Sequence, residues 1–406
     1  MHEVTERDRM AADTSKHQQS EIDPSEYGVE AEERPYQDRL SDLPTDMRSR
    51  MLDAGIVVDE AVGRSGTFVQ VDHSTVHSSV NADTVEMLPV RQALDEYDWA
   101  ADLWWKAVSQ ETDEYTRSLE EAEYNGYFIR ARRGQKTLLP LQACLYMGTA
   151  GSAQRVHNIL VAEEGSELHI ITGCTSETHG QHGLHLGVSE FYIRKGAKVT
   201  YTMIHNWDPA IAVRPRTGIV LEEDSTFLSN YVIMKPVRDL QTNPAAYCQG
   251  PNATVRFNSV MASYEGSRLD AGSRVFLNAP GCRTEIISRT IARGGETIAR
   301  GYIEGNAPDV KGHLECCGLM LGDKGAIHAI PELRGSVAGI DLSHEAAVGK
   351  IAEEEVEYLM ARGLTHSEAT ATIVRGFLRV DIEGLPDALG AELRKAIETS
   401  EQDLTD

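Results

Sequence analysis

The chain has 406 residues, 41% of them hydrophobic and 25% charged, which is an ordinary composition for a soluble globular protein. Acidic residues outnumber basic ones by 63 to 39, and the resulting net charge of −24 argues against a nucleic-acid partner, because a phosphate backbone would be repelled. No apolar run approaches the roughly 20 residues of a membrane span, and the N-terminus lacks the apolar core of an export signal, so we expect a cytoplasmic protein without membrane association.

The first part of the chain is polar and then helical in pattern. Residues 1–45 are acidic and carry few large apolar side chains, which predicts a disordered tail. Residues 46–123 are predicted to form a helical N-terminal segment, because DMRSRMLDAGI is typical of a short helix and residues 88–123 carry apolar side chains at three- and four-residue spacing. We expect Trp99, Trp104 and Trp105 to anchor this segment to the main body rather than to bind a ligand.

The pattern changes at residue 124, and the new pattern continues to residue 345. Runs such as EEGSELHIITG, RKGAKVTYTMI and GPNATVRFNSV each join a turn signal to a strand of alternating polarity. No helix-length pattern interrupts these runs. A sandwich or barrel can hold so many strands, but repeated turn-then-strand units favour a β-solenoid, whose stacked coils bury a continuous core.

Residues 346–406 return to a helical pattern. The apolar residues of IAEEEVEYLMARG share one side of a helix, and Gly363 stands where a C-cap glycine belongs. Thr365 and Glu368 form a capping box that opens HSEATATIVRGFLR, and LPDALGAELRKAIETSEQ supplies a third helix. The predicted fold is therefore mainly β, with a long β-core between two helical segments.

Six cysteines are candidates for metal or sulfur chemistry, although no two of them form a CxxC pair. In a cytosolic chain of this size we expect free thiols, and the simplest interpretation of each is a small buried apolar side chain. They are Cys144, Cys174, Cys248, Cys282, Cys316 and Cys317. The last two are adjacent, so on a strand they face opposite sides and at most one is expected to face a given site.

The stretch ITGCTSETHGQHGLHLG places Cys174 ahead of three histidines. Thiolate and imidazole together suit zinc, copper or iron–sulfur chemistry. His179 and His182 are interleaved with glycines, which is typical of a solvent-facing loop. His185 begins a strand-like run, where its position would be fixed.

A second group of polar residues stands where the β-core is predicted to end. His344 and Glu345, in IDLSHEAAVGK, can be metal ligands or can cap the helix that follows, and capping is the simpler interpretation. The chain contains no phosphate-binding P-loop, no G-x-S-x-G nucleophile elbow and no H-E-x-x-H zinc helix. Because these motifs are absent, the sequence gives no support to an ATPase, serine hydrolase or zincin activity.

Three long motifs, GCTSETHGQHGLHLGVSEFYIRKGAKVTYTMIHNWDP, HLECCGLMLGDKGAIHAIPEL and SHEAAVGKIAEEEVEYLMARGLTHSEATATIVRGFL, together resemble the core of the SufB/SufD family of iron–sulfur cluster assembly scaffolds. The resemblance covers about residues 125 to 380. The modest length of the chain and its short sequences ITGC, HNW, RFNSV and SHEAAVGKI most resemble those of the short archaeal-type SmsB branch of the minimal SUF-like system.

This resemblance implies a right-handed parallel β-helix flanked by helical segments, and a non-enzymatic scaffold that holds a transient iron–sulfur cluster. Members of the family pair with one another, so a homodimer or a heterodimer with a SufB/SufD paralogue is expected. They also bind a separate ABC-type ATPase, SufC or its SmsC equivalent, through the C-terminal helical region. ATP hydrolysis is therefore expected in that partner, and residues 346–406 are expected to dock it.

The resemblance also assigns residues. Cys174 falls on the cysteine of the family's GCT motif and His185 on the histidine of its downstream LH pair, while Cys316 stands six residues ahead of the family's GD step. His344 and Glu345 fall on the family's HEA, near the interface where a cluster is proposed to form. Cys248, in YCQGPNA, falls on a position linked to sulfur acceptance. The implied ligands are Cys174, Cys316 and Cys144, with His344 or Glu345 as the non-thiol ligand.

One position departs from the family pattern. SufB places a ligand cysteine three residues after the glycine of GD, where this chain has Gly325. The departure favours an alternative in which the chain is a SufD-like structural partner that does not itself hold the cluster. A β-helix enzyme that uses the histidine loop is a third alternative, but no cluster of carboxylates or basic residues in the predicted β-core supports it.

Overall fold

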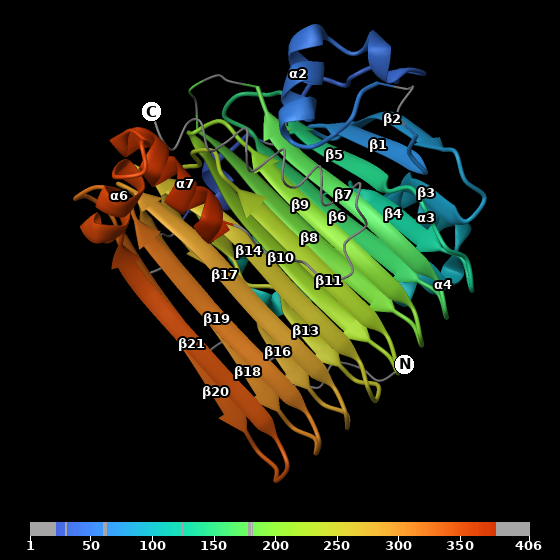
Figure 1. Cartoon of the computed structure of the whole chain (residues 1–406). Coiled ribbons are helices and arrows are strands. Elements are labelled where there is room, and N and C mark those ends of the chain that lie inside the picture. Colours follow the sequence, from blue (N-terminus) through green and yellow to red (C-terminus); the bar gives the residue numbers. More distant parts are fainter. Residues whose placement is uncertain are drawn as a thin grey trace.

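Two large β-sheets lie face to face and make up most of the molecule (Figure 1). The computed structural model describes residues 22–28, 31–59, 63–122, 125–177, 180 and 182–378. From β4 (Tyr127–Ala131) onward the chain alternates between the two sheets, and neighbouring strands within each sheet run parallel. This architecture is a parallel β-solenoid, so the predicted β-helix core is confirmed.

The first sheet has ten strands and begins with an antiparallel hairpin. In spatial order they are β2 (Ser74–Val80), β1 (Gly66–Val71), β5 (Leu141–Met147), β7 (Glu167–Ser176), β9 (Lys198–Asn206), β11 (Thr226–Ile233), β14 (Thr254–Tyr264), β17 (Arg283–Arg293), β19 (Lys311–Met320) and β21 (Asp341–Lys350). Because these coils are in register, equivalent residues stack in columns. All side chains of one column face the same side of the sheet, and neighbouring columns face the lumen and the outer face in turn.

The second sheet has eleven strands. In spatial order they are β12 (Asp239–Thr242), β15 (Arg268–Ala271), β18 (Glu296–Gly305), β16 (Arg274–Leu277), β13 (Ala245–Cys248), β10 (Ile211–Leu221), β8 (Gly183–Ile193), β6 (Ala153–Ala162), β4 and β3 (Val85–Pro89), and β20 (Ala326–Gly335) pairs with β18. The short strands β12 and β13 both pair with the long strand β10, and β15 and β16 both pair with β18. Each of these two short pairs therefore corresponds to one long strand that is interrupted in the middle.

Tight turns join the strands, as the sequence predicts. Gly165, Gly196, Asp224 and Asn252 occupy turns of successive coils, and each has a positive φ between 56° and 68°. Glycine, aspartate and asparagine tolerate this left-handed conformation best. Each of the four backbone N–H groups donates to a carbonyl of the next coil at 2.9–3.0 Å, so the turns stack in the same register as the strands.

The N-terminal part differs from both of its predictions. The predicted helical segment 46–123 contains the strands β1, β2 and β3 as well as helices. Its helices are α2 (Thr45–Asp53), α3 (Val90–Glu96), α4 (Asp98–Ala101), α5 (Glu114–Glu120) and the 3-10 turn η4 (Gln110–Thr112). Strand β1 pairs in parallel with β5 and is buried along its whole length, so it extends the solenoid by one strand and tertiary pairing overrides the helical reading.

The predicted tail 1–45 is ordered where the structure describes it. The 3-10 turns η2 (Pro24–Glu26) and η3 (Leu40–Asp42) lie in this region, while residues 1–21 are outside the described part. Leu40 and Leu43 are each 5% exposed and pack with Met51 of α2. Two apolar side chains suffice to anchor a segment that is polar on average, which is why composition alone mispredicted it.

The predicted tryptophan anchor is present. Trp104 stacks on the His157 ring at a centroid distance of 3.7 Å, and the backbone N–H groups of Trp105, Ala107 and Val108 donate to the buried carboxylate of Glu190 at 2.6–3.0 Å. His157 also contacts Glu190, with 2.8 Å between Nε2 and Oε2. The segment after α4 is thus held on the outer face of the second sheet.

Helices α6 (Glu353–Met360) and α7 (His366–Leu378) follow β21; α7 lies against the first sheet and α6 packs beside α7 (Figure 1). The capping box is confirmed, because Thr365 N donates to Glu368 Oε2 at 2.7 Å and Glu368 N donates to Thr365 Oγ1 at 3.3 Å. The predicted third helix, 385–402, lies outside the described residues. None of the helices in the described part of the chain is long and apolar enough to cross a membrane.

Candidate functional site

Cys144 and Cys174 lie on adjacent strands of the first sheet but face opposite ways. Strand register pairs Cys174 with Leu145, so Cys144 belongs to the neighbouring column. Cys174 is part of the cluster that fills the lumen, whereas Cys144 packs on the outer face with Met51 and Ile56. Both side chains are fully buried. The sheet therefore separates these two predicted ligands, and Cys144 has the packing of a small apolar residue.

Cys174 has two histidines near it in the lumen. His205 of β9 stands directly opposite Cys174 in the ladder, and His185 of β8 reaches in from the second sheet. Trp207 lies between the two imidazoles, donating from Nε1 to His205 Nδ1 at 3.1 Å and packing on the His185 ring at 4.9 Å. His185 Nδ1 is 2.8 Å from Gln154 Oε1. The sequence quoted His205 within HNW but gave no reason to select it.

Burial sets the protonation of this lumen group. It raises the pKa of the Cys174 thiol far above its usual value. It lowers the pKa of both His185 and His205 to about 3, and the charge of His185 contributes at His205. The imidazoles are therefore neutral, and His205 Nε2 has no hydrogen-bond partner within the described part of the protein. Because Trp207 donates to Nδ1, the neutral His205 ring carries its own proton on Nε2, and in this arrangement neither nitrogen offers a free lone pair to a metal.

Cys316 also faces the lumen but belongs to a distant coil. It lies on β19, in the column of Thr172, Met203 and Ser288, and is 1% exposed. Burial raises its pKa to about 11. Five strand steps separate β7 from β19, which corresponds to about 24 Å along the solenoid. One chain therefore does not bring Cys174 and Cys316 to a common metal.

The last coil, β20 and β21, forms an uncovered end of the solenoid. Its residues are mostly exposed, including those in columns that face the lumen in earlier coils. His344 and Glu345 lie within β21 itself, in register with Leu314 and Glu315 of β19. The sequence pattern predicts that they lie at the boundary between the β-core and the C-terminal helices, where capping a helix was the simpler interpretation. They cap no helix, because α6 begins eight residues after Glu345.

The outer side of the same end carries a second thiol. Cys317 is half-buried beside Glu315, whose carboxylate is 3.5 Å from its sulfur and forms an ion pair with Arg289 at 2.5 Å. Burial raises the pKa of Cys317, and the charges of Glu315 and Glu345 add to the effect. Cys316 and Cys317 thus place one thiol on each face of the sheet next to the uncovered end.

Cys248 and Cys282 form a third group. Cys248 ends β13 and Cys282 directly precedes β17, both are fully buried, and their side chains hydrogen-bond each other. The sequence selected Cys248 but not Cys282. Their proximity follows from the stacking of successive coils, for which the spacing of the two cysteines gives no signal.

Gly325 is the residue that the resemblance sets at the position of a ligand cysteine. Its φ is +96°, and a Cβ added to it would lie 2.6 Å from the carbonyl oxygen of Gly295. Glycine is thus required both by the backbone conformation and by the close approach of the neighbouring coil. A side chain at this position would need the backbone to move.

The described part of the histidine loop forms no metal site with the thiols. His182 is exposed and contacts the Arg238 guanidinium, while His179 lies outside the described residues. Within the described ranges no three His, Cys, Asp or Glu side chains gather closely enough to hold a metal ion.

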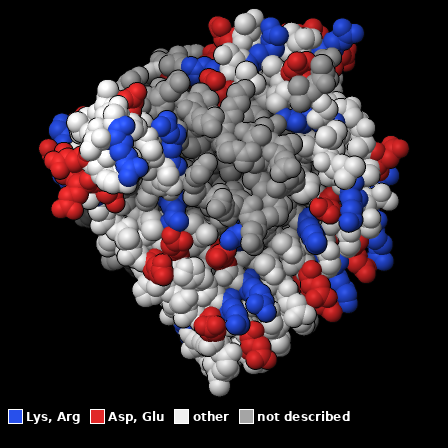
Figure 2. Space-filling model, viewed as in Figure 1, with Lys and Arg blue, Asp and Glu red and all other residues white. Residues whose placement is uncertain are grey.

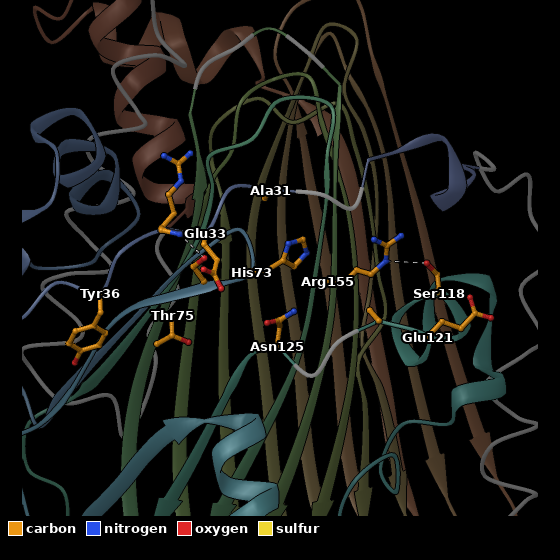
Figure 3. A pocket seen from close by; sticks show the side chains of 12 residues that line it. Ala31, Glu33, Tyr36, His73, Thr75, Ser118, Glu121, Asn125 and Arg155 are labelled. Atoms are coloured by element: carbon orange, nitrogen blue, oxygen red, sulfur yellow. Dashed lines mark hydrogen bonds between the residues drawn. The ribbon is translucent and has the colours of Figure 1, made fainter.

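A large polar cavity of about 1020 Å³ lies elsewhere, among the N-terminal residues (Figure 3). Its lining includes Arg34, His73 and Arg155, and Arg155 donates from Nε to Ser118 Oγ at 3.3 Å. No cysteine lines this cavity. It is therefore not a site for thiol-held metal.

The chain matches one protein-family model over residues 145–377, described as the SufBD core domain of SUF-system iron–sulfur cluster assembly. An iron–sulfur cluster assembly SufBD family protein of Archaeoglobus fulgidus is 50% identical over 357 residues, which cover 88% of this chain and 96% of that protein. A family member from Methanothermobacter thermautotrophicus is 47% identical over 380 residues, covering 92% of each. The iron–sulfur cluster assembly protein SufB of Bacillus subtilis is 27% identical, over 88% of this chain and 78% of its own length.

Proposed function

The chain belongs to the SufBD family of iron–sulfur cluster assembly proteins, and on this basis we propose that it is a scaffold on which a nascent cluster is built and from which it is transferred. The family membership is the observation that carries the proposal. In this role the protein is not itself an enzyme, and ATP hydrolysis takes place in a separate ABC-type ATPase of the SufC/SmsC kind. The complex works in the cytoplasm.

The cluster is held at the uncovered end of the solenoid. Cys316 supplies a thiolate there, and His344 of the next strand, which faces the same side of the sheet, supplies a non-thiol ligand, whereas Glu345 faces the other side with Cys317. Thiolates are the usual ligands of iron–sulfur clusters, and a mixed ligand set suits a cluster that must leave. Cys174 and the neutral His205 lie deep in the lumen, away from that end. Cys144, on the outer face under α2, takes no part.

Two copies of the chain join through this end. Strand β21 pairs only with β19 and β20 only with β18 among the described strands, so both present a free edge. Val348 of β21 and Val337 of the preceding turn are 43% and 40% exposed, which is apolar surface that a second copy would cover. Two chains would bring two sets of Cys316, His344 and Glu345 together. A SufB/SufD paralogue could replace the second copy in the same geometry.

The ATPase docks on the C-terminal helices. Tyr358 and Met360 of α6 are 57% and 42% exposed, and Tyr358, Leu359 and Ile373 line an open groove between α6 and α7 of about 550 Å³. Acidic side chains of α6 surround it, as the red atoms at the left edge of Figure 2 show. Helix α7 packs Val374 and Leu378 onto the first sheet, so motion of a docked ATPase would be passed to the β-core.

A SufD-like role, in which the chain supports a cluster-binding paralogue, is the second candidate. The backbone at Gly325 favours it, because the cysteine that SufB has at this position does not fit here. Copurification separates the two roles. The scaffold forms a complex with the ATPase alone, whereas a SufD-like chain requires a SufB-like companion as well.

Anaerobic reconstitution of the purified chain with iron and sulfide tests the scaffold role. We expect visible absorption from a bound cluster, with Cys248 available to receive sulfur when sulfide is replaced by a persulfide donor. A chain that binds no cluster in the presence of its ATPase and without a paralogue would overturn the scaffold role and leave the SufD-like one.

A further inference from the structure

Cys248 and Cys282 lie together beneath two stacked turns of the solenoid. The first turn follows Cys248 and exposes Pro251 and Asn252, and the second precedes Cys282 and exposes Pro280. Both cysteine side chains are fully buried. The pair is thus buried, but it lies next to turns whose residues reach the solvent.

The surroundings of the two sulfurs are unequal. The Cys248 and Cys282 side chains form a hydrogen bond with each other, and the backbone N–H groups of Ala253, Ala279 and Asn252 also interact with Cys282. These donors lower the pKa of Cys282, the contact with Cys248 contributing most, while the same contact and burial raise the pKa of Cys248. Hydrogen bonds to a sulfur favour its thiolate form, so of the two thiols Cys282 is the one that ionises more readily.

Close backbone contacts hold the two turns in place. A Cβ on Gly281 would lie 2.4 Å from Asn252 Oδ1, and a Cβ on Gly250 would lie 1.9 Å from the backbone nitrogen of Glu223. As a neutral thiol, Cys282 donates to the Gly250 carbonyl oxygen at 3.3 Å. The sulfurs therefore sit in a fixed geometry rather than on mobile loops.

We propose that Cys248 and Cys282 act together as a dithiol that converts a bound sulfane sulfur into sulfide. The inference rests on the proposed acceptance of sulfur by Cys248. A small-molecule or protein persulfide R–S–SH gives its outer sulfur to Cys248, which becomes Cys248–S–SH while R–SH leaves. The Cys282 thiolate then attacks the inner sulfur of Cys248, the S–SH bond breaks, and the products are a Cys248–Cys282 disulfide and HS⁻.

The electrons balance within this step. The sulfane sulfur gains two electrons on becoming sulfide, and the two cysteine sulfurs together lose two on forming the disulfide. One thiol alone holds a persulfide but supplies no second sulfur for the disulfide. A dithiol reductant from solution then restores the pair. Cys282 is in this way the residue that releases sulfur at the oxidation level that an iron–sulfur cluster needs.

A single-turnover experiment on the full chain tests the pair. The reduced protein is treated anaerobically with cysteine persulfide, freed of excess reagent, and analysed for released sulfide and by peptide mass mapping. We expect about one sulfide per chain and a Cys248–Cys282 disulfide. In Cys282→Ser we expect a persulfide retained on Cys248 and at least about tenfold less sulfide. Cys317→Ser, which removes a half-buried thiol elsewhere, should behave like the unaltered chain.

Sulfide release from Cys282→Ser at the unaltered rate, or a disulfide that joins other cysteines, would overturn the inference. Cluster reconstitution with iron and ready-made sulfide separates this inference from the scaffold role and reports folding, since Cys282→Ser should then match the unaltered chain. If the unaltered chain forms no cluster from sulfide, the scaffold role fails. If Cys282→Ser forms cluster equally well from persulfide, only the dithiol fails. Cys282→Ala repeats the test should the serine variant not fold.

Discussion

Cys174 and Cys316 point into the same lumen, yet five strand spacings, about 24 Å, separate them along the solenoid. An iron–sulfur cluster is only a few ångströms across, so within one chain these two thiols serve different sites.

The separation predicts unequal effects on cluster binding. Cys316→Ser should remove most of the cluster absorption after anaerobic reconstitution, because Cys316 lies next to the uncovered end. Cys174→Ser should keep most of it, since Cys174 is five strands away. Iron and sulfide analysis of both variants alongside the absorption spectrum checks this. Equal loss in the two variants would contradict a cluster at the end of the solenoid.

The uncovered end predicts a dimer that one charge disrupts. Val348→Asp places a carboxylate on the exposed face of β21, so we expect the chain to shift from dimer to monomer in light scattering coupled to gel filtration. Val80→Asp is the matched control, because Val80 is similarly exposed, at 38%, on β2 at the opposite edge of the first sheet. If Val80→Asp lost the dimer and Val348→Asp kept it, the interface would lie at the β2 edge and not at the uncovered end.

Buried histidines predict a loss of stability in acid. His185 and His205 have a pKa of about 3 in the folded protein and about 6.5 when unfolded, so the unfolded state binds more protons between these values. The free energy of unfolding should fall by up to about 1.4 kcal/mol per pH unit for each histidine as the pH drops below 6.5. Urea unfolding at pH 6.5 and pH 5 measures this.

The variant His205→Gln should lose about 2 kcal/mol less than the unaltered chain over that interval, since one titrating group is gone. The exposed His182→Gln is the control and should keep the original pH dependence. Identical curves for all three proteins would show that the lumen histidines already accept protons in the fold.

Gly325 predicts a structural cost for restoring the SufB-type cysteine. Gly322 and Gly325 have φ of +85° and +96°, but a Cβ on Gly322 would meet nothing within 4 Å, whereas one on Gly325 would meet the Gly295 carbonyl at 2.6 Å. Gly322→Ala should cost about 1–2 kcal/mol from the left-handed backbone alone. Gly325→Ala and Gly325→Cys should cost about 1–3 kcal/mol more, as in an overpacked core. The denaturant midpoints of the three variants measure these costs. Equal costs at Gly322 and Gly325 would mean that the neighbouring coil moves to make room for the added side chain.

The buried carboxylate of Glu190 predicts a large loss of stability on truncation. Glu190→Ala removes the acceptor of three backbone N–H groups and of His157 inside the protein, so we expect a loss of about 3–5 kcal/mol in the free energy of unfolding. Glu120→Ala, an exposed position at the end of α5, should change it by less than about 0.5 kcal/mol. Similar thermal midpoints for the two variants would contradict this role of Glu190.

The turn-and-strand pattern of residues 124–345 was enough to predict the solenoid, because each coil repeats local chemistry: a left-handed turn residue followed by alternating side chains. The capping box of Thr365 and Glu368 could also be predicted from the sequence, because all its partners lie within four residues of one another. The strands β1 to β3 were missed because the helical pattern of the residues on either side was extended across them, and it is their pairing with β5 and β4 that shows them to be strands.

The sequence by itself determined the coils, the turns and the identity of the six thiols, because these depend on residues close together in the chain. Only the tertiary structure decided which thiols meet. The register of stacked coils turns Cys144 outward and Cys174 inward, sets Cys316 five strands from Cys174, and brings Cys248 to Cys282. Register depends on the exact length of every coil and on which face each strand presents, and a shift of one residue in any coil would reverse that face.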